Sequence, residues 1–181
     1  MIKDINIIIP LRDEEEQAEI TVLSLKEELK DLKKNFVITL IDDHSRDSTW
    51  DLLNQLKAKH ANVEIFKNEY DAGYGNAARF GIEKNKCDSV VFFMGDCSDD
   101  PADIKIYVDY LDQGFDCVFG SRFIKSSKVV DYPLLKLILN RIANNFVRLL
   151  FLTKYNDVTN AFKAYKKELL IDFKPIVSKH F

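Results

Sequence analysis

The sequence predicts an α/β protein with a Rossmann-like, mostly parallel β-sheet flanked by helices. Short runs rich in Ile, Val and Phe alternate with helical patterns along the chain, which is typical of βαβ units. The apolar runs lack alternating polar residues, so we expect strands that are covered on both faces. Polar residues gather where these runs end, as they do at the ligand-binding edge of such sheets.

Each expected element follows from its local pattern. The expected strands span residues 5–9, 36–41, 63–66, 89–93 and 117–119. The expected helices span residues 14–32, 47–58, 76–86 and 101–111, and the last begins at Pro101 with Asp99 or Asp100 as its N-cap. A long amphipathic helix is expected at 133–152, followed by a loop and a strand within 157–165.

Length and composition indicate a single soluble globular domain, residues 1–181. The chain is 46% hydrophobic and 30% charged, and its net charge of −3 gives no electrostatic argument for a nucleic-acid partner. The three cysteines are scattered without a CxxC pair, which favours reduced thiols and a cytoplasmic location over disulfides or a zinc site. The sequence shows neither a secretory signal nor an apolar run of about 18–20 residues, and contact with the cytoplasmic membrane surface stays open.

Candidate functional residues lie where four of the five expected strands end. Ligands of open parallel sheets bind at the carboxyl ends of the strands, so these side chains are expected to share one edge. One polar strand end could be a helix cap, but four are hard to explain in that way. The residues concerned are Pro10, Arg12 and Glu14 after the first strand, Asp42 and Asp43 after the second, Asp96 after the fourth, and Arg122 after the fifth.

Two loops at this edge have both a functional and a structural interpretation. In IDDHSRDSTW (residues 41–50), Ser45 suits the N-terminus of a helix, whereas Asp42 and Asp43 precede it and could accept hydrogen bonds from a base or ribose. Gly73 and Gly75 could cradle a phosphate at a helix start, or serve a turn that needs positive φ and close packing.

The stretch FMGDCSDDP (residues 93–101) carries three acids with different expected roles. Asp96 ends a core strand and is expected to hold a divalent cation beside a diphosphate. Asp99 and Asp100 are expected chiefly to start the next helix. Arg122 offers a planar fork suited to phosphate, with a salt bridge to one of the clustered acids as the alternative.

The expected helix at 133–152 has a broad apolar face and a narrow polar stripe that includes Arg141 and Arg148. A helix of this kind could lie in the headgroup region of a membrane. Alternatively, it packs on the sheet or pairs with residues further toward the C-terminus.

The order of these motifs resembles family 2 glycosyltransferases. IIIPLRDEEE, IDDHSRDST, the loop at residues 73–77, FMGDCSDDP, GSRF and DVTNAFKAY are similar to successive motifs of that family, over residues 5 to about 173. The branch that looks most similar is the dolichyl-phosphate mannose synthase type, which moves a sugar from a nucleotide onto a polyprenyl phosphate. The resemblance implies a GT-A fold, with about residues 1–122 binding the nucleotide sugar and about 123–181 on the acceptor side. It also implies further acceptor-side helices after Phe181, so we expect a shortened chain or a naturally short form.

Carried over by position, the resemblance implies roles for individual residues. Asp96 would hold Mg²⁺ or Mn²⁺ and the diphosphate with Ser98 as a weak ligand, and Arg122 would meet the acceptor phosphate. The residues implied around the base and ribose are Pro10, Arg12, Glu14 and Asp43. The chain departs from the family pattern at several residues: His44 replaces a glycine, Met94 replaces the first acid of an Asp-x-Asp motif, and Asn160 and Ala161 precede Phe162 where the family often has glycine.

The implied reaction is an inverting, metal-dependent transfer from a GDP- or UDP-sugar to an acceptor. A polyprenyl phosphate is already an anion and needs no general base, whereas a saccharide hydroxyl needs one, for which Asp157 is the candidate. One alternative is a nucleotide-sugar-binding domain with little turnover, because a metal ligand is missing at Met94. Another is an NAD-binding Rossmann protein, which the position of the glycines disfavours.

Overall fold

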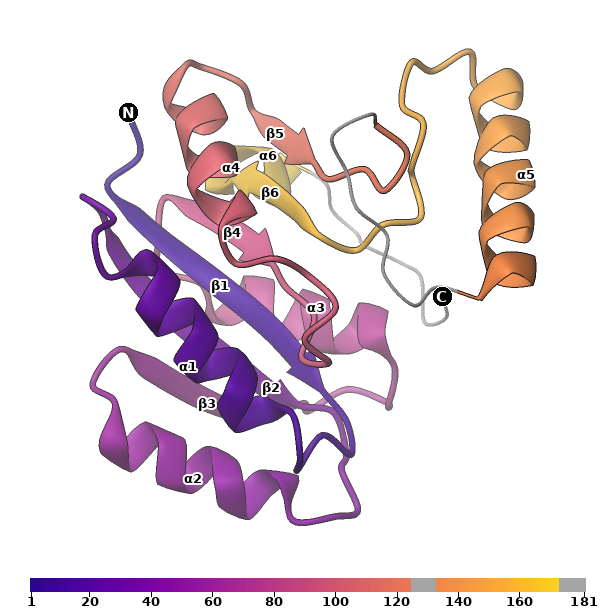
Figure 1. Ribbon diagram of the computed structural model, residues 1–181. Coiled ribbons are helices and arrows are strands. Elements are labelled where there is room, and N and C mark those ends of the chain that lie inside the picture. Colours follow the sequence, from indigo (N-terminus) through magenta and orange to yellow (C-terminus); the bar gives the residue numbers. More distant parts are fainter. Residues whose placement is uncertain (125–132, 173–181) are drawn as a thin grey trace.

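The computed structural model describes residues 1–124 and 133–172 and has a central sheet between two layers of helices (Figure 1). The strands are β1 (Asp4–Leu11), β2 (Asn35–Asp42), β3 (Val63–Lys67), β4 (Ser89–Phe92), β5 (Cys117–Phe119) and β6 (Lys163–Lys166). The helices are α1 (Ala18–Leu29), α2 (Thr49–Lys59), α3 (Tyr74–Lys84), α4 (Asp103–Asp112), α5 (Leu134–Leu150) and α6 (Lys167–Asp172). The parts of the expected acceptor side at 125–132 and 173–181 lie outside the described residues.

The strand order is β3-β2-β1-β4-β6-β5, and the predicted mostly parallel α/β sheet is confirmed. β2 and β4 flank β1 in parallel, and β3 pairs with β2 in parallel. β6 is antiparallel to both β4 and β5 and lies between them. Because β6 comes from the part of the chain expected on the acceptor side, both parts of the chain share one sheet.

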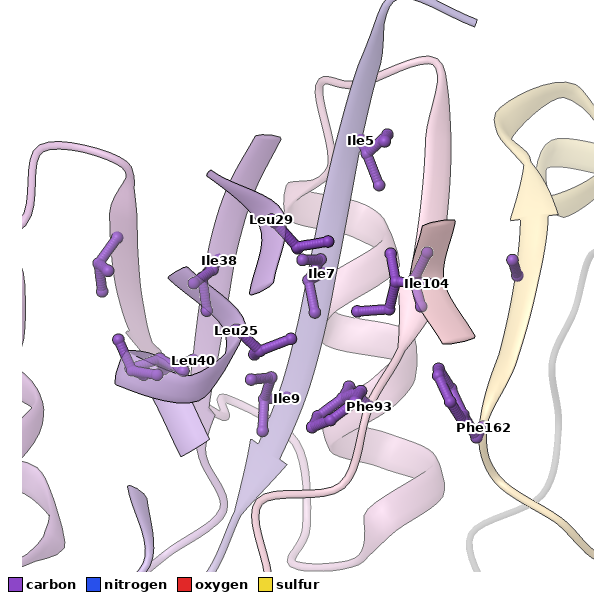
Figure 2. Close-up of a cluster of buried hydrophobic side chains, with 14 of the residues drawn as sticks. Ile5, Ile7, Ile9, Leu25, Leu29, Ile38, Leu40, Phe93, Ile104 and Phe162 are labelled. Carbon is purple, nitrogen blue, oxygen red and sulfur yellow. The ribbon is translucent and has the colours of Figure 1, made fainter. Parts of the chain in front are cut away.

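The core forms because successive side chains of a strand point to opposite faces. Ile5, Ile7 and Ile9 of β1 pack on the face covered by α1, α2 and α4, whereas Ile8 packs on the opposite face with α3 and α6. Figure 2 shows the first cluster, in which Leu25 and Leu29 of α1 lie beside Ile7 and Ile9 of β1. Both faces of the central strands are therefore apolar, as their unbroken hydrophobic runs predict.

Helices α1, α2 and α4 each start at least two residues later than expected, and α2 begins at Thr49 rather than at residue 47. Residues 14–17 form a turn in which Glu14 O accepts hydrogen bonds from the backbone N–H groups of Gln17 and Ala18, so α1 begins at Ala18 rather than at residue 14. Residues 100–103 form a similar turn ahead of α4, which begins at Asp103 rather than at Pro101. In contrast, α3 begins two residues earlier than expected.

Helix α5 does not pack its apolar face on the sheet, so that interpretation of the amphipathic pattern is wrong. The helix stands to one side of the sheet (Figure 1), and Asn144 is its one buried residue. Large apolar side chains are exposed along the helix and just after it: Leu134, Leu135, Ile138, Leu139, Ile142, Phe146, Leu149, Leu150, Phe151 and Leu152. We call this set the α5 apolar face. In residues 1–124 and 133–172, α5 included, no helix is long and apolar enough to cross a membrane.

Candidate functional site

The carboxyl ends of β1, β2, β4 and β5 lie at one edge of the sheet, as expected. β5 runs in the same direction as β4 because both are antiparallel to β6. The loops after β1 and β2 are joined by reciprocal hydrogen bonds, in which Asp13 N–H donates to Ser45 Oγ (3.0 Å) and Arg46 N–H donates to Asp13 Oδ1 (2.6 Å). Ser45 therefore ties two loops together and does not cap α2, which begins at Thr49.

The residues expected around a base and ribose after β1 differ in exposure. Pro10 is buried within β1, Arg12 is exposed, and Glu14 is half-buried. Burial raises the pKa of the Glu14 carboxyl, and the negative charges of Asp96 and then Asp47 raise it further. Three loops thus bring carboxylates close to one another, which favours a cation at this edge. Contact of these residues with a nucleotide stays a prediction.

Asp42 and Asp43 are both buried where β2 ends. Asp43 uses both carboxylate oxygens: Oδ1 accepts a hydrogen bond from Asn68 Nδ2 (2.7 Å) and Oδ2 accepts one from Gly73 N–H (2.8 Å). Asp42 Oδ1 accepts a longer hydrogen bond from Ser45 N–H (3.4 Å). Asp43 therefore fixes the loop that leads into α3, and a contact of either carboxylate with a base or ribose stays a prediction.

Gly73 has the positive φ that the structural interpretation of the glycine loop, a turn, requires. Gly73 has φ 150° and ψ 139° and directly precedes α3, whereas Gly75 lies buried in the first turn of that helix. Contact of this glycine loop with a phosphate stays a prediction. His44, on the neighbouring loop, has φ 61°, in the left-handed region that favours glycine. That conformation accounts for the glycine that the similar family carries at this position.

Asp96 is exposed on the loop after β4, and its Oδ1 accepts a hydrogen bond from Ser98 N–H (3.0 Å). The preceding residue, Gly95, is buried, and Thr21 Oγ1 donates to its carbonyl oxygen (3.0 Å). A Cβ atom on Gly95 would lie 2.1 Å from Leu11 Cδ2. A side chain at position 95 would have to displace the buried Leu11, so glycine suits this close approach just before Asp96.

Asp99 and Asp100 have separate roles in the same loop. Asp99 Oδ2 accepts a hydrogen bond from Met94 N–H (3.0 Å), so the expectation that Asp99 caps the next helix is wrong. Asp100 Oδ1 accepts one from Ala102 N–H (3.0 Å), at the turn that leads into α4. Burial, together with a smaller effect of the charge of Asp96, raises the pKa of Asp99 to about 6, although the Met94 hydrogen bond opposes the rise.

Arg122, expected to meet a phosphate, forms an ion pair with Asp157. Its Nε and backbone N–H donate to Asp157 Oδ2 (2.8 and 3.0 Å), and its Nη2 donates to Oδ1 (2.8 Å). The Asp157 side chain is fully buried, whereas 27% of the Arg122 side chain is exposed. Burial would raise the pKa of Asp157, but the hydrogen bonds and charge of Arg122 outweigh burial and lower it. The partner of Arg122 thus lies outside the acidic cluster after β4.

The donor set at Asp96 fits a cation that takes most of its ligands from a bound diphosphate and water. Among the residues that the structure describes, no three His, Cys, Asp or Glu side chains gather to hold a metal. Mg²⁺ typically binds through one or two carboxylates together with substrate phosphates and water. One exposed carboxylate beside the half-buried Glu14 meets that requirement.

Sequence reasoning missed several residues that shape this edge. Asn68 holds Asp43, and Asn144 and Thr159 hold Asp157. These are uncharged residues in a loop or a polar stripe, where a solvent-facing role is the ordinary expectation. The burial of Asn144 inside an otherwise exposed helix is visible only in the folded chain.

Comparisons with known proteins agree with the fold. The family model described as glycosyl transferase family 2 matches residues 6–173. The polyprenol monophosphomannose synthase of Mycolicibacterium smegmatis is 29% identical over 150 residues, which cover 80% of this chain and 57% of that protein. The dolichol-phosphate mannosyltransferase of Pyrococcus furiosus is 27% identical over 177 residues, covering 95% and 49%. The chain thus spans about half the length of these relatives.

Solved structures share the architecture at low sequence identity. The glucosyl-3-phosphoglycerate synthase of Mycobacterium tuberculosis, in complex with Mn²⁺, uridine diphosphate and phosphoglyceric acid, superposes with a TM-score of 0.70. It is 19% identical, and the match covers 93% of this chain and 57% of that one. Residues 1–349 of TarS from S. aureus give a TM-score of 0.61 at 18% identity, with 93% and 48% covered. At these identities the likeness concerns the fold.

Proposed function

Because the chain belongs to glycosyl transferase family 2 and has the GT-A fold, we propose that it transfers a sugar from a nucleoside diphosphate sugar to a polyprenyl phosphate. One curated relative is named as a polyprenol monophosphomannose synthase, and the other as a dolichol-phosphate mannosyltransferase. The sugar and the base of the donor are left open in this proposal.

One observation supports the choice of acceptor: Arg122, whose guanidinium suits a phosphate, is linked by hydrogen bonds to α5, whose apolar face is exposed. Arg122 is held by Asp157, which in turn accepts a hydrogen bond from Asn144 of α5 (3.4 Å). The guanidinium of Arg141 on α5 lies over the ring of Phe123, 5.3 Å from its centroid. A polyprenyl phosphate combines an anionic head with a long apolar tail, and this pair of neighbouring features matches both parts.

The chemistry of Asp157 supports the same acceptor. A sugar hydroxyl must lose a proton during transfer, and an effective general base has a pKa near the working pH. Asp157 is fully buried, ion-paired and has a lowered pKa, so it makes a poor base. The phosphate oxygen of a polyprenyl phosphate attacks the anomeric carbon as an anion, while the bond from that carbon to the nucleoside diphosphate breaks. No proton has to be removed.

The donor would bind along the edge formed by the loops after β1, β2 and β4. In this proposal Asp96 holds a divalent cation together with the diphosphate, and Ser98 lies beside it. When bound there, such a cation would supply positive charge for the negative charge of the departing nucleoside diphosphate. Mn²⁺ and a uridine diphosphate are bound together in a structure of the same fold, which supports a metal of this class without separating Mg²⁺ from Mn²⁺.

Contact with a membrane surface is part of the proposal, because the acceptor is a lipid. The α5 apolar face is exposed, and α5 carries Lys136, Arg141 and Arg148 with no acidic residue between Leu134 and Leu150. Cationic amphipathic helices of this kind lie in the interface of membranes that contain anionic lipids.

A transfer assay tests the proposal. The protein is incubated with Mg²⁺ or Mn²⁺, a radiolabelled GDP- or UDP-sugar, and vesicles that contain a polyprenyl phosphate. We expect the label in the lipid fraction, and we expect EDTA to abolish its appearance. If labelled donor binds with metal but no label reaches lipid or any saccharide offered, the protein is a nucleotide-sugar-binding domain instead.

A further inference from the structure

Helix α5 is attached to the domain by its polar stripe rather than by its apolar face. Asn144 is 2% exposed, while the α5 apolar face on the same helix is open to solvent. Amphipathic helices in globular proteins ordinarily bury the apolar side. Among the residues that the structure describes, specific hydrogen bonds therefore contribute to the attachment of α5, and their partners show which loop this helix contacts.

Asn144 makes four hydrogen bonds, and three of them reach the loop before β6. Its Oδ1 accepts from Val158 N–H (2.7 Å), and its Nδ2 donates to Asp157 Oδ1 (3.4 Å) and to Thr159 Oγ1 (3.2 Å). The fourth runs from Nδ2 to Asn140 O (3.0 Å), one helical turn earlier. One side chain of α5 thus contacts three consecutive residues of this loop.

The same loop orients Arg122. Asp157 receives three hydrogen bonds from Arg122, and Thr159 Oγ1 accepts a fourth from Arg122 Nη2 (2.9 Å). The Thr159 hydroxyl also donates to Asp157 Oδ1 (3.2 Å), so it serves as one donor and two acceptors, as a hydroxyl can. Arg122, Asp157, Thr159 and Asn144 form one connected network with a single buried acid at its centre.

We infer that Asn144 is a positioning residue for Arg122. It acts through Asp157 and Thr159. The orientation of the Arg122 guanidinium therefore depends on the position of α5. The inference deepens the proposed function and rests on it in so far as Arg122 is taken to meet the acceptor phosphate. In this arrangement a helix that contacts the lipid surface sets the position of the side chain that binds the lipid headgroup.

Substitution of Asn144 with a matched neighbour as control tests this inference. Asn144→Ala removes the side chain of the network, and Asn145→Ala makes the same change at an exposed position of the same helix. We expect Asn144→Ala to raise the KM for polyprenyl phosphate about tenfold and to leave the KM for the nucleotide sugar unchanged. Asn145→Ala should change neither. Equal losses for both substrates, or no change in either, would overturn the inference.

A second measurement is independent of turnover. In ¹⁵N NMR spectra, the Nε–H of Arg122 should exchange slowly with solvent in the wild type and in Asn145→Ala, and at least tenfold faster in Asn144→Ala. If the wild type transfers no sugar but the exchange rates differ as expected, the proposed function fails and the positioning role stands. If exchange is unaffected, the positioning role fails whatever the activity.

Asn144→Asp covers the case in which Asn144→Ala does not stay folded. The carboxylate keeps an oxygen for Val158 N–H but loses the donor to Asp157 and Thr159. The same rise in the acceptor KM and the same faster exchange are expected. Wild-type values for both in a folded Asn144→Asp protein contradict the positioning role.

Discussion

The carboxylate of Asp99 accepts a hydrogen bond from the backbone N–H of Met94, 3.0 Å away, and so closes the loop after β4 upon itself. This contact separates the acids of FMGDCSDDP by role. Asp99 is the half-buried acid that shapes the loop, Asp100 contacts the turn before α4, and Asp96 is the exposed acid on the loop after β4. Met94 matters here through its backbone, which binds Asp99.

Asp99→Asn is expected to stabilise the protein at neutral pH. The pKa of Asp99 is raised from 3.8 to about 6, so the folded state holds this proton more tightly than the unfolded state. The contribution of Asp99 to the unfolding free energy therefore falls as pH rises from about 4 to about 6 and stays low above that range. An amide keeps an oxygen for Met94 N–H and carries no charge. We expect a gain of about 2–3 kcal/mol at pH 7.5 and much less at pH 4.

Urea denaturation of both proteins in EDTA, at several pH values between 4 and 7.5, measures this difference. A loss of about 1 kcal/mol that does not depend on pH would instead indicate a helix cap at Asp99.

Asp96→Asn is expected to abolish metal-dependent binding of a nucleoside diphosphate with little effect on stability. Asp96 is exposed, and an amide oxygen can still accept the hydrogen bond from Ser98 N–H. An amide is a weaker ligand than a carboxylate for a hard divalent cation. Isothermal titration calorimetry with GDP and UDP, each with Mn²⁺ and with EDTA, measures the effect. Asp99→Asn serves as the control. A larger loss of nucleotide binding in Asp99→Asn than in Asp96→Asn would show that Asp96 is not the metal ligand.

Asp43→Asn is expected to reduce both stability and nucleotide affinity. The two oxygens of Asp43 face two donors, Asn68 Nδ2 and Gly73 N–H, so an amide must turn its own NH₂ toward one of them. Loss of a buried hydrogen-bond acceptor costs about 1–3 kcal/mol. Asp42→Asn is the matched control, since Asp42 is equally buried and accepts one long hydrogen bond from Ser45 N–H. Asp43→Asn alone should show a lower Tm in thermal unfolding and faster cleavage of the loop before α3 in limited proteolysis.

Ile142→Asp is expected to weaken binding to vesicles that contain anionic lipids. Ile142 is 61% exposed on the α5 apolar face, and a carboxylate there opposes both apolar insertion and the attraction of Arg141 and Arg148 to the lipid headgroups. Ile106→Asp on α4 makes the same change at a site that is 51% exposed, so it controls for the added charge. Co-sedimentation with vesicles should fall about tenfold for Ile142→Asp and stay at the wild-type level for Ile106→Asp. Equal sedimentation of both variants would exclude α5 as the membrane contact.

The sheet could be predicted from the sequence because its strands are buried on both faces. An unbroken apolar run such as residues 5–9 has few other structures available to it, and β1 indeed spans Asp4–Leu11. The start of α1 was harder to predict. The residues ahead of it form hydrogen bonds to another loop, for example from Glu14 N–H to Thr49 Oγ1 (2.9 Å), and a helical pattern does not reveal such contacts.

The candidate site could be predicted as an edge but not as a set of contacts. Parallel strands bring their carboxyl ends together, which placed Asp43, Asp96 and Arg122 on the same side of the sheet. The partner of each side chain depends on loop backbone and on residues distant in sequence, such as Asp157 for Arg122. The orientation of α5 could not be predicted, because a polar stripe ordinarily faces solvent. In the folded chain Asn144 of this stripe instead accepts a hydrogen bond from Val158 N–H.

We propose that this protein glycosylates a lipid phosphate, whose negative charge makes a general base unnecessary. The most direct measurement compares a polyprenyl phosphate with the corresponding polyprenol in the same vesicles, with the same labelled nucleotide sugar and metal. We predict transfer to the phosphate alone, with Arg122→Ala raising the KM for that acceptor. Transfer to the polyprenol or to a saccharide hydroxyl at a comparable rate would contradict this acceptor assignment, because those acceptors require a base that Asp157 is unable to provide.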